Sequence, residues 1–284
     1  MKLYVIGNGF DQEHCIESDY AYFAYYMWEK HADVMSQCEF FKDNVLCDLW
    51  ADFEAALGSI NINDILPELE DEAWKNEPEE LRRQSNLMVD TVSRGCDVLM
   101  KIYETFFEEW VEQIDLSGTE AWIELDKSAL FFTFNYTETL EEVYGIPKEQ
   151  ILHIHNCRSS ASHEPLIVGH YNMLRPQYSG EGWIATDEID NSLKDVYERT
   201  RKPVKRLIEK NEPFFKSLRN VDEVYVYGHS LNDIDMDYFH KIKRSVLPNA
   251  KWTVSYLQSE EKAKFEYILK HVLHVKSFQL VILE

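Results

Sequence analysis

The stretch Met1-Lys2-Leu3-Tyr4-Val5-Ile6-Gly7-Asn8-Gly9-Phe10-Asp11 decides the fold. Leu3 to Ile6 is a short apolar run that ends at a glycine pair, which is typical of a buried strand leaving into a tight loop. Glycines at that place let backbone N–H groups approach a pyrophosphate beside the N-terminus of the next helix. The fingerprint of dehydrogenases requires a third glycine at position 12, where this chain has Gln12. The loop therefore favours nucleotide binding over hydride transfer, and an ordinary strand-to-helix turn is the alternative.

Strand-like and helix-like segments alternate along the rest of the chain, which is typical of a parallel sheet covered by helices on both faces. We therefore predict one α/β domain over residues 1–284, with a Rossmann-type parallel sheet. The expected strands after the first are residues 129–134, 151–155, 165–169, 223–227, 251–257 and 278–283, and the expected helices between them are residues 189–218, 234–246 and 260–272.

Residues 18–118 interrupt this alternation with a helical pattern, and we predict a large insertion there that forms a lid or a second lobe. Apolar pairs recur every three to four residues from Val98 to Ile114, as in one long amphipathic helix. The segment after Ser18 is so rich in aromatic residues that one helix face cannot bury them all. Part of that surface is therefore expected to pair with another subunit in a homo-oligomer.

The composition limits the range of functions. The 284 residues are 45% hydrophobic and include 51 acidic and 29 basic side chains, for a formal net charge of −22. That charge disfavours non-specific nucleic-acid binding and docking on anionic membranes. No long apolar run precedes Asp11, so we expect a cytoplasmic protein. The five cysteines are scattered without a C-x-x-C pair, which fits reduced thiols and excludes a four-cysteine zinc ribbon.

Two polar motifs follow consecutive predicted strands. Thr133-Phe134-Asn135 ends the first, where a carboxamide can bond a ribose hydroxyl or a water; the alternative is that Asn135 caps a helix starting near Thr137. His153-Ile154-His155-Asn156 ends the second, and the imidazole of His155 is suited to proton transfer. With His163 and His170, four histidines fall within 18 residues, but their spacing fits no common zinc pattern and we predict no metal.

A third motif, Tyr227-Gly228-His229-Ser230, follows another predicted strand. Gly228 permits close approach of a ligand and the Ser230 hydroxyl can bond a phosphate or a ribose; a turn followed by an acidic helix cap is the alternative. The carboxylates at 233, 235 and 237 could suggest a metal-dependent nuclease, but residues at i and i+2 of a helix diverge. Because parallel strands end at one edge, all these motifs are expected to converge there.

These motifs together resemble the abortive-infection AbiH family of phage-defence proteins. The resemblance rests on GNGFD at residues 7–11, WADFE at 50–54, FNYTETLE at 134–141, HIHN at 153–156, IVGH at 167–170 and GHSLNDIDMDYF at 228–239. The order of the glycine loop, the Asn-containing strand end, the histidine motif and the Gly-x-Ser loop is also similar to that of sirtuins.

The resemblance implies a sirtuin-like core that takes NAD as substrate or ligand. It places Gly7, Asn8 and Gly9 on the pyrophosphate, Asn135 and His155 beside the nicotinamide ribose, and Gly228 and Ser230 on the adenosine side. Asp11 and Thr133 complete the predicted nucleotide-binding residues. Asn135 and His155 are the predicted catalytic residues of an NAD hydrolase, in which acidic groups such as Asp11, Asp52 or Glu54 help to stabilise positive charge on the ribose. For Asp52 and Glu54 a structural role in a helix is the favoured alternative.

The chain departs from the family pattern at three places. Asn156 stands where the family usually has a glycine, and the segment Gln12–Ile16 lacks a glycine that is usual near Cys15. The zinc ribbon of true sirtuins is missing, which favours cleavage of the nucleotide over protein deacetylation.

A rival interpretation is a nucleotide sensor or scaffold that binds a defence-system partner protein and does no chemistry. Residues 194–219, with nine basic and four acidic side chains, could hold such a partner or a nucleic acid. A solvated helix surface is the favoured interpretation of that stretch, Lys202 included.

Overall fold

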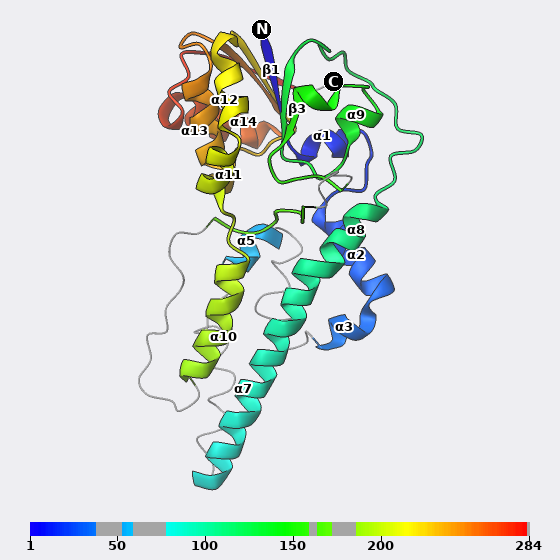
Figure 1. Cartoon of the computed structure of the whole chain (residues 1–284), viewed down its shortest axis with the longest axis vertical. Helices are drawn as coiled ribbons and strands as arrows, with labels where there is room; N and C mark the ends of the chain where they lie inside the picture. The colour runs from blue at the N-terminus through cyan, green and yellow to red at the C-terminus, as the bar shows by residue number, and fades with distance from the viewer. Residues whose placement is uncertain (38–52, 59–77, 159–163, 172–185, 283–284) are drawn as a thin grey trace. The chain divides into compact units, whose positions relative to one another are not determined.

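A computed structural model describes residues 1–37, 53–58, 78–158, 164–171 and 186–282 (Figure 1). The chain divides into two compact units, which we call the sheet unit and the helical unit. The sheet unit consists of Met1–Asp19, Val111–Ile167 and Pro203–Glu284, and the helical unit of Tyr20–Trp110 and Val168–Lys202. The helical unit thus contains most of the predicted insertion and, in addition, a segment after Ile167 that the sequence did not assign to it.

Six parallel strands form one sheet in the order β3-β2-β1-β4-β5-β6. Their bounds are β1 Lys2–Ile6, β2 Leu130–Thr133, β3 Ile151–His153, β4 Glu223–Tyr227, β5 Lys251–Tyr256 and β6 Ser277–Ile282. The predicted α/β class with a Rossmann-type parallel sheet is therefore confirmed. The strand order reverses between β1 and β4, which makes this the topological switch point where open α/β sheets bind ligands.

One face of the sheet carries an aromatic ladder across its centre. Tyr4 of β1 stacks on its register partners, Phe131 of β2 with ring centroids 5.1 Å apart and Tyr225 of β4 at 5.0 Å. Phe10 of helix α1 (Asn8–Glu13) and Leu140 of α9 (Thr139–Glu142) are buried in the same cluster. These two short helices therefore cover the β2–β1 side of this face.

The opposite face is covered by helices from the C-terminal part of the chain. The next residue of β2, Phe132, points the other way and contacts Phe215 of α12 (Glu212–Ser217) at 5.9 Å and Tyr238 of α13 (Met236–Ser245) at 6.0 Å. Helix α11 (Val204–Lys210) packs on α13, and α14 (Ser259–Tyr267) packs on β5. Successive apolar side chains of β2 therefore pack against helices on opposite faces of the sheet, and both faces are buried.

Two predicted elements differ from the structure. The helical pattern at residues 189–218 is divided into α10 (Thr186–Arg199), α11 and α12, because Pro203 precedes α11 and a second proline occupies the first turn of α12. The predicted strand at residues 165–169 is wrong. Its backbone groups bond to side chains and loops instead, and an isolated bridge between His170 and Arg201 is the only pairing that the described residues show there.

The helical unit is built on a long helix, α7 (Pro78–Lys101), which continues through a π-helical turn at Ile102–Phe106 into α8 (Phe107–Gln113). Helix α10 packs along α7, with the hydroxyl oxygens of Ser93 and Ser192 3.2 Å apart (Figure 1). Among the described residues, no helix is both long and apolar enough to cross a membrane.

An aromatic cluster joins α2 (Tyr20–Lys30) to α5 (Phe53–Leu57), while α3 (Ala32–Gln37) packs on α2 and α7. The ring of Phe23 lies 5.5 Å from Phe53 and 5.4 Å from Phe107. The aromatic residues after Ser18, which were expected to be too many for one helix face, are partly buried and partly exposed. Phe23 and Tyr26 are buried, whereas Tyr22, Tyr25 and Trp28 are exposed, and pairing of these exposed residues with another subunit stays a prediction.

A buried ion pair lies in the same unit. The ammonium of Lys202 is 2.7 Å from Oε1 of Glu54, and the Lys202 side chain exposes 1% of its surface. The same carboxylate accepts a hydrogen bond from the backbone N–H of Gly169 at 3.2 Å. The interpretation of Lys202 as part of a solvated helix surface is therefore wrong, and Glu54 has the structural role that was the favoured alternative. Asp52 lies outside the described residues.

Replacing Lys202 tests this pair. Lys202→Met is expected to lower the free energy of unfolding by about 3–5 kcal/mol, because it removes the cation from a buried carboxylate. The measurement is chemical denaturation, and the double variant Lys202→Met, Glu54→Gln should recover part of the loss. Lys194→Met, at a lysine on α10 that is half exposed, is the matched control and should change stability by less than about 0.5 kcal/mol. Equal effects of the two single substitutions would contradict a structural role for the Lys202 pair.

Candidate functional site

The carboxyl ends of four neighbouring strands bring the predicted site residues to one edge of the sheet. Gly7 to Gly9 follow β1, Asn135 follows β2, His155 follows β3, and Gly228 and Ser230 follow β4. These strands are adjacent in the order β3-β2-β1-β4. The convergence predicted from parallel strands is therefore confirmed.

The loops after β1 and β4 meet backbone to backbone. The N–H of Gly7 donates to the carbonyl of Tyr227 at 3.0 Å, and the N–H of Gly9 donates to that of Gly228 at 2.8 Å. A Cβ at Gly228 would lie 2.0 Å from the backbone nitrogen of Phe10, and its φ of +64° is in the left-handed region. The glycines are thus required by the contact between the two loops, and the amides of Gly7 and Gly9 are already bonded within the protein.

The polar residues beside these glycines also bond to the chain itself. The Asn8 amide donates to the carbonyl of Ser18 at 3.0 Å and accepts from the Ser18 hydroxyl at 2.7 Å, which fixes the loop after α1. Ser230 is exposed at the end of β4. A role for Gly7, Asn8, Gly9, Gly228 and Ser230 in nucleotide binding stays a prediction.

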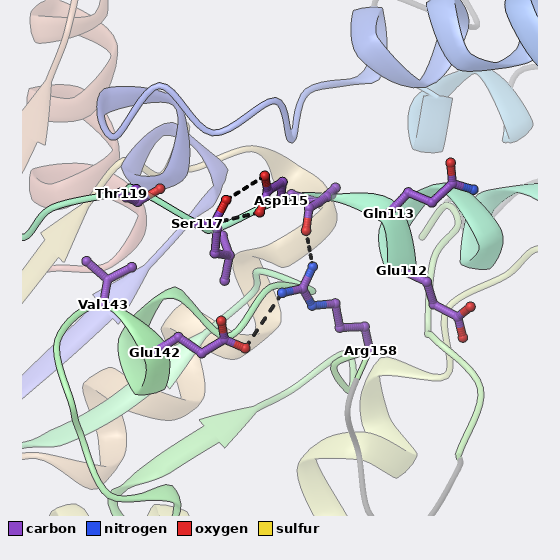
Figure 2. A pocket seen from close by; sticks show the side chains of 11 residues that line it. Glu112, Gln113, Asp115, Ser117, Thr119, Glu142, Val143 and Arg158 are labelled. Atoms are coloured by element: carbon purple, nitrogen blue, oxygen red, sulfur yellow. Dashed lines mark hydrogen bonds and ion pairs between the residues drawn. The ribbon is translucent and has the colours of Figure 1, made fainter.

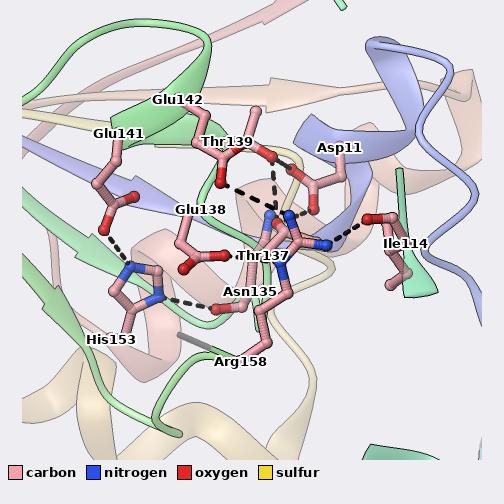
Figure 3. Close-up of polar contacts among 10 residues, drawn as sticks. All are labelled: Asp11, Ile114, Asn135, Thr137, Glu138, Thr139, Glu141, Glu142, His153 and Arg158. Atoms are coloured by element: carbon pink, nitrogen blue, oxygen red, sulfur yellow. Dashed lines mark hydrogen bonds and ion pairs between the residues drawn. The ribbon is translucent and has the colours of Figure 1, made fainter. Parts of the chain in front are cut away.

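Asp11 carries a carboxylate with no exposed surface, held by two threonines (Figure 3). The hydroxyl of Thr137 donates to one of its oxygens at 2.5 Å, and that of Thr139 donates to the other at 2.8 Å. Burial raises the pKa of Asp11 above its ordinary value, whereas these hydrogen bonds act in the opposite direction. The carboxylate therefore joins helix α1 to the loop between β2 and α9.

Asn135 lies at the centre of this loop and exposes 6% of its surface. Its N–H donates to the hydroxyl of Thr133 at 3.1 Å, and its carbonyl accepts from Nδ1 of His153 at 3.0 Å. Its side-chain oxygen Oδ1 is buried and has no hydrogen-bond partner in the described part of the chain. Helix α9 begins at Thr139 with Glu138 as its N-cap residue, so the alternative that Asn135 caps a helix is wrong.

The two histidines of the HIHN motif have different surroundings. His153 contacts the carbonyl of Asn135 through Nδ1, and its Nε2 lies 3.1 Å from Oε1 of Glu141. His155 exposes 2% of its surface and lies among aromatic rings, with the centroid of Phe134 at 5.6 Å and that of Tyr238 at 5.7 Å. His155 thus occupies an apolar environment beside the Asn135 loop, whereas His153 supports that loop directly.

His229, which sequence reasoning did not select, also lies against Phe134. Its ring centroid is 4.4 Å from that of Phe134, its Nδ1 accepts from the N–H of Leu231 at 2.9 Å, and its Nε2 is 3.2 Å from Oδ2 of Asp235. Asp235 is therefore engaged by a histidine. Among the described residues, no group of three or more His, Cys, Asp or Glu side chains is arranged to hold a metal ion.

A pocket of about 640 Å³ lies beside the site (Figure 2). Among its lining residues, the Arg158 guanidinium donates to Oε2 of Glu138 at 2.7 Å and to the carbonyl of Ile114, and lies 3.7 Å from Glu142. Sequence reasoning missed Arg158 and Glu141, because one charged residue in a loop or short helix has no periodic signal. The rest of the lining is residues 112, 113 and 115–119 and Val143, so none of the predicted site residues lines this pocket.

The two places where the chain lacks an expected glycine share one backbone conformation. Cys15 has a φ of 58° and Asn156 a φ of 65°, both in the left-handed region that favours glycine. The backbone at these corners is therefore the one that glycine would adopt, while the side chains differ.

A comparison with protein families decides the class of the chain. The family model described as "Bacteriophage abortive infection AbiH" matches residues 3–256, which include all of β1 but its first residue, β2 to β5 and every predicted site residue. The chain belongs to the AbiH family. No curated protein and no solved structure matches this AbiH chain. The family assignment makes it a phage abortive-infection protein, and the likeness to sirtuins stays a prediction.

The contact between the two loops can be tested by adding one methyl group. Gly228→Ala is expected to destabilise this AbiH chain by more than about 2 kcal/mol, because the Cβ overlaps the backbone at Phe10 in addition to the strain of a positive φ. Gly118→Ala is the matched control, since Gly118 has a φ of +79° and nothing within 4 Å of an added Cβ. It should cost only the strain, about 1–2 kcal/mol. Equal losses in chemical denaturation would show that the loops are not in close contact.

Proposed function

We propose that this AbiH-family chain binds an NAD-type nucleotide at the carboxyl edge of its sheet and hydrolyses the bond between nicotinamide and ribose. The observation that carries the proposal is the buried, unpartnered Oδ1 of Asn135, next to a buried histidine from the neighbouring strand end. A buried polar atom is costly unless a partner satisfies it, so such an atom at this edge indicates a ligand group that donates a hydrogen bond.

The chemistry assigns one role to each side chain. Water forms a bond to C1′ of the ribose while the bond from C1′ to the nicotinamide nitrogen breaks. The electron pair of that bond neutralises the pyridinium, and the water loses one proton to the solvent. Asn135 holds the attacking water through Oδ1, and His155 orients a ribose hydroxyl. The products are nicotinamide and ADP-ribose.

The resemblance implies that Gly7 and Gly9 bind the pyrophosphate, but their N–H groups already donate within the protein. Because Gly7 and Gly9 donate to the β4 loop, a pyrophosphate would have to be held by other groups or would have to displace these bonds. Gly228 and Ser230 lie at the same edge and suit the adenosine side, where the exposed hydroxyl of Ser230 can bond a ribose or phosphate oxygen.

The burial of both candidate catalytic side chains bears on regulation. Asn135 and His155 are almost fully covered in the free chain, so substrate reaches them only after nearby groups move. We therefore expect low turnover from the purified protein and higher turnover when a phage component is present. A nucleotide sensor that binds without turnover is the competing function, favoured by the same burial.

Nicotinamide release is the discriminating measurement, made on the purified chain with NAD in the presence and absence of lysate from phage-infected cells. Asn135→Ala is expected to abolish release, and His155→Ala to lower it about 10²–10⁴-fold, while both variants stay folded. Asn220→Ala and His271→Ala replace exposed residues of the same types and should retain the wild-type rate.

Binding of NAD in calorimetry separates the two functions. Binding without nicotinamide release under every activating condition would favour the sensor. Equal release from wild type and Asn135→Ala would show that the reacting site lies elsewhere.

A further inference from the structure

The last strand of the sheet, β6, has an outer edge with which no strand of the described chain pairs. In the order β3-β2-β1-β4-β5-β6 its one neighbour is β5. The backbone N–H and C=O groups that point away from β5 are therefore available to a further strand. A strand from another protein molecule can complete such an edge through main-chain hydrogen bonds.

The sequence of β6 lacks the features that keep an edge strand single. Such strands usually carry a charge, a proline or a bulge, or are very short. The opposite edge strand, β3, has only three residues. In contrast, β6 has six residues, none of which is charged or a proline, and it follows β5 in unbroken register. Ile282 at its end exposes 51% of its surface. This edge therefore has the properties of a strand that is paired.

The side chains of β6 specify what kind of strand fits beside it. Every second residue is a large apolar one, namely Phe278, Leu280 and Ile282. They lie on the buried face of β5, because Leu280 is the register partner of Val254, which has no exposed surface. The other three residues of β6 point to the opposite face. A partner strand must therefore place apolar side chains beside the first set.

A second copy of β6 meets this requirement when the two strands run antiparallel about Leu280. That register places Leu280 opposite the Leu280 of the second copy, and Phe278 opposite Ile282 at both ends of the pair. Directly opposite side chains lie on the same face of a sheet, so the apolar residues of the two strands meet one another. The strand is thus complementary to itself about a two-fold axis, as the interfaces of most homodimers are.

The distribution of charge also favours a second copy. The chain has a net charge of −22, so two copies repel each other over most of their surfaces. The uncharged β6 avoids this repulsion. Lys276, which is exposed just before β6, lies at opposite ends of the pair in the two copies. Counted about Leu280, the position opposite Lys276 is 284, a glutamate in the sequence that lies outside the described residues.

We propose that β6 is an interface between two copies of this chain, paired antiparallel about Leu280 so that their sheets form one continuous sheet. The π-helical turn Ile268–Val272 lies over β6 in each copy, with Nζ of Lys270 5.9 Å from the ring centroid of Phe278. A two-fold axis normal to the sheet brings the two turns to the same face. They enlarge the interface beyond the strand pair.

Charges introduced at the two-fold position test the pairing. Light scattering on the full chain at micromolar concentration is expected to give twice the mass of 33.6 kDa. Leu280→Lys places two ammonium groups opposite each other and should weaken the dimer about 10²-fold or more. Leu280→Glu should do the same, whereas an equimolar mixture of the two variants should form a heterodimer. Leu87→Lys, at an exposed leucine of α7, is the matched control and should stay dimeric.

Hydrogen exchange tests the same strand without any substitution, and decides the question if the Leu280 variants do not fold. Both edges of β6 are bonded in the dimer, so its backbone N–H groups should exchange more slowly as the protein concentration is raised through the range of dimerisation. The N–H groups of β3, at the other edge of the sheet, are the internal control and should exchange at a constant rate.

Several results would overturn the interface or its register. A wild-type chain that stays monomeric rejects the interface, as does a dimer that persists in both folded Leu280 variants. A dimer that is lost instead in Tyr25→Lys, at an exposed aromatic residue of α2, places the contact in the helical unit. Exchange in β6 that is independent of concentration while the chain dimerises also rejects it. Folded single variants whose mixture stays monomeric reject the register about Leu280.

Discussion

The close contact between the loops after β1 and β4 is the constraint on which the rest of the sheet unit depends. At the switch point of an open α/β sheet these two loops usually diverge and leave a crevice. Here Gly9 donates directly to the carbonyl of Gly228, which has a positive φ and lies against the backbone of Phe10. Only glycine fits there, because any side chain would overlap backbone atoms. The two residues that we propose as catalytic, Asn135 and His155, follow β2 and β3 instead.

On that side the polar groups are arranged around one buried carboxyl group, that of Asp11. Asp11 is carried by the first turns of the chain after β1, yet its partners Thr137 and Thr139 follow β2. The cost of removing this carboxyl group from water is offset by the two threonine hydroxyls that donate to it. The same two bonds join the segment after β1 to the segment after β2, in which Asn135 lies.

The family assignment concerns the biological process in which the protein acts, whereas the site geometry concerns the reaction that we propose. Membership of the AbiH family gives the biological setting, phage abortive infection. The reaction must be argued from side chains, because a Rossmann-type sheet supports many chemistries. Asn135 and His155 are nearly enclosed by the protein itself. Their burial is the reason that we expect the proposed activity to depend on a change in the structure around them.

The sequence by itself determined the α/β class, the parallel sheet and the edge where the motifs meet, because hydrophobic period and strand-end position are local properties. It also indicated that Asn135 and His155 follow strands of that sheet. It could not show that Lys202, within a basic stretch, pairs with Glu54 inside the helical unit, nor that Arg158 and Glu141 support the site. Each of those interactions joins residues that are distant in sequence or lack a repeating pattern. Partner choice depends on which loops the fold brings together, and only the tertiary structure decides it.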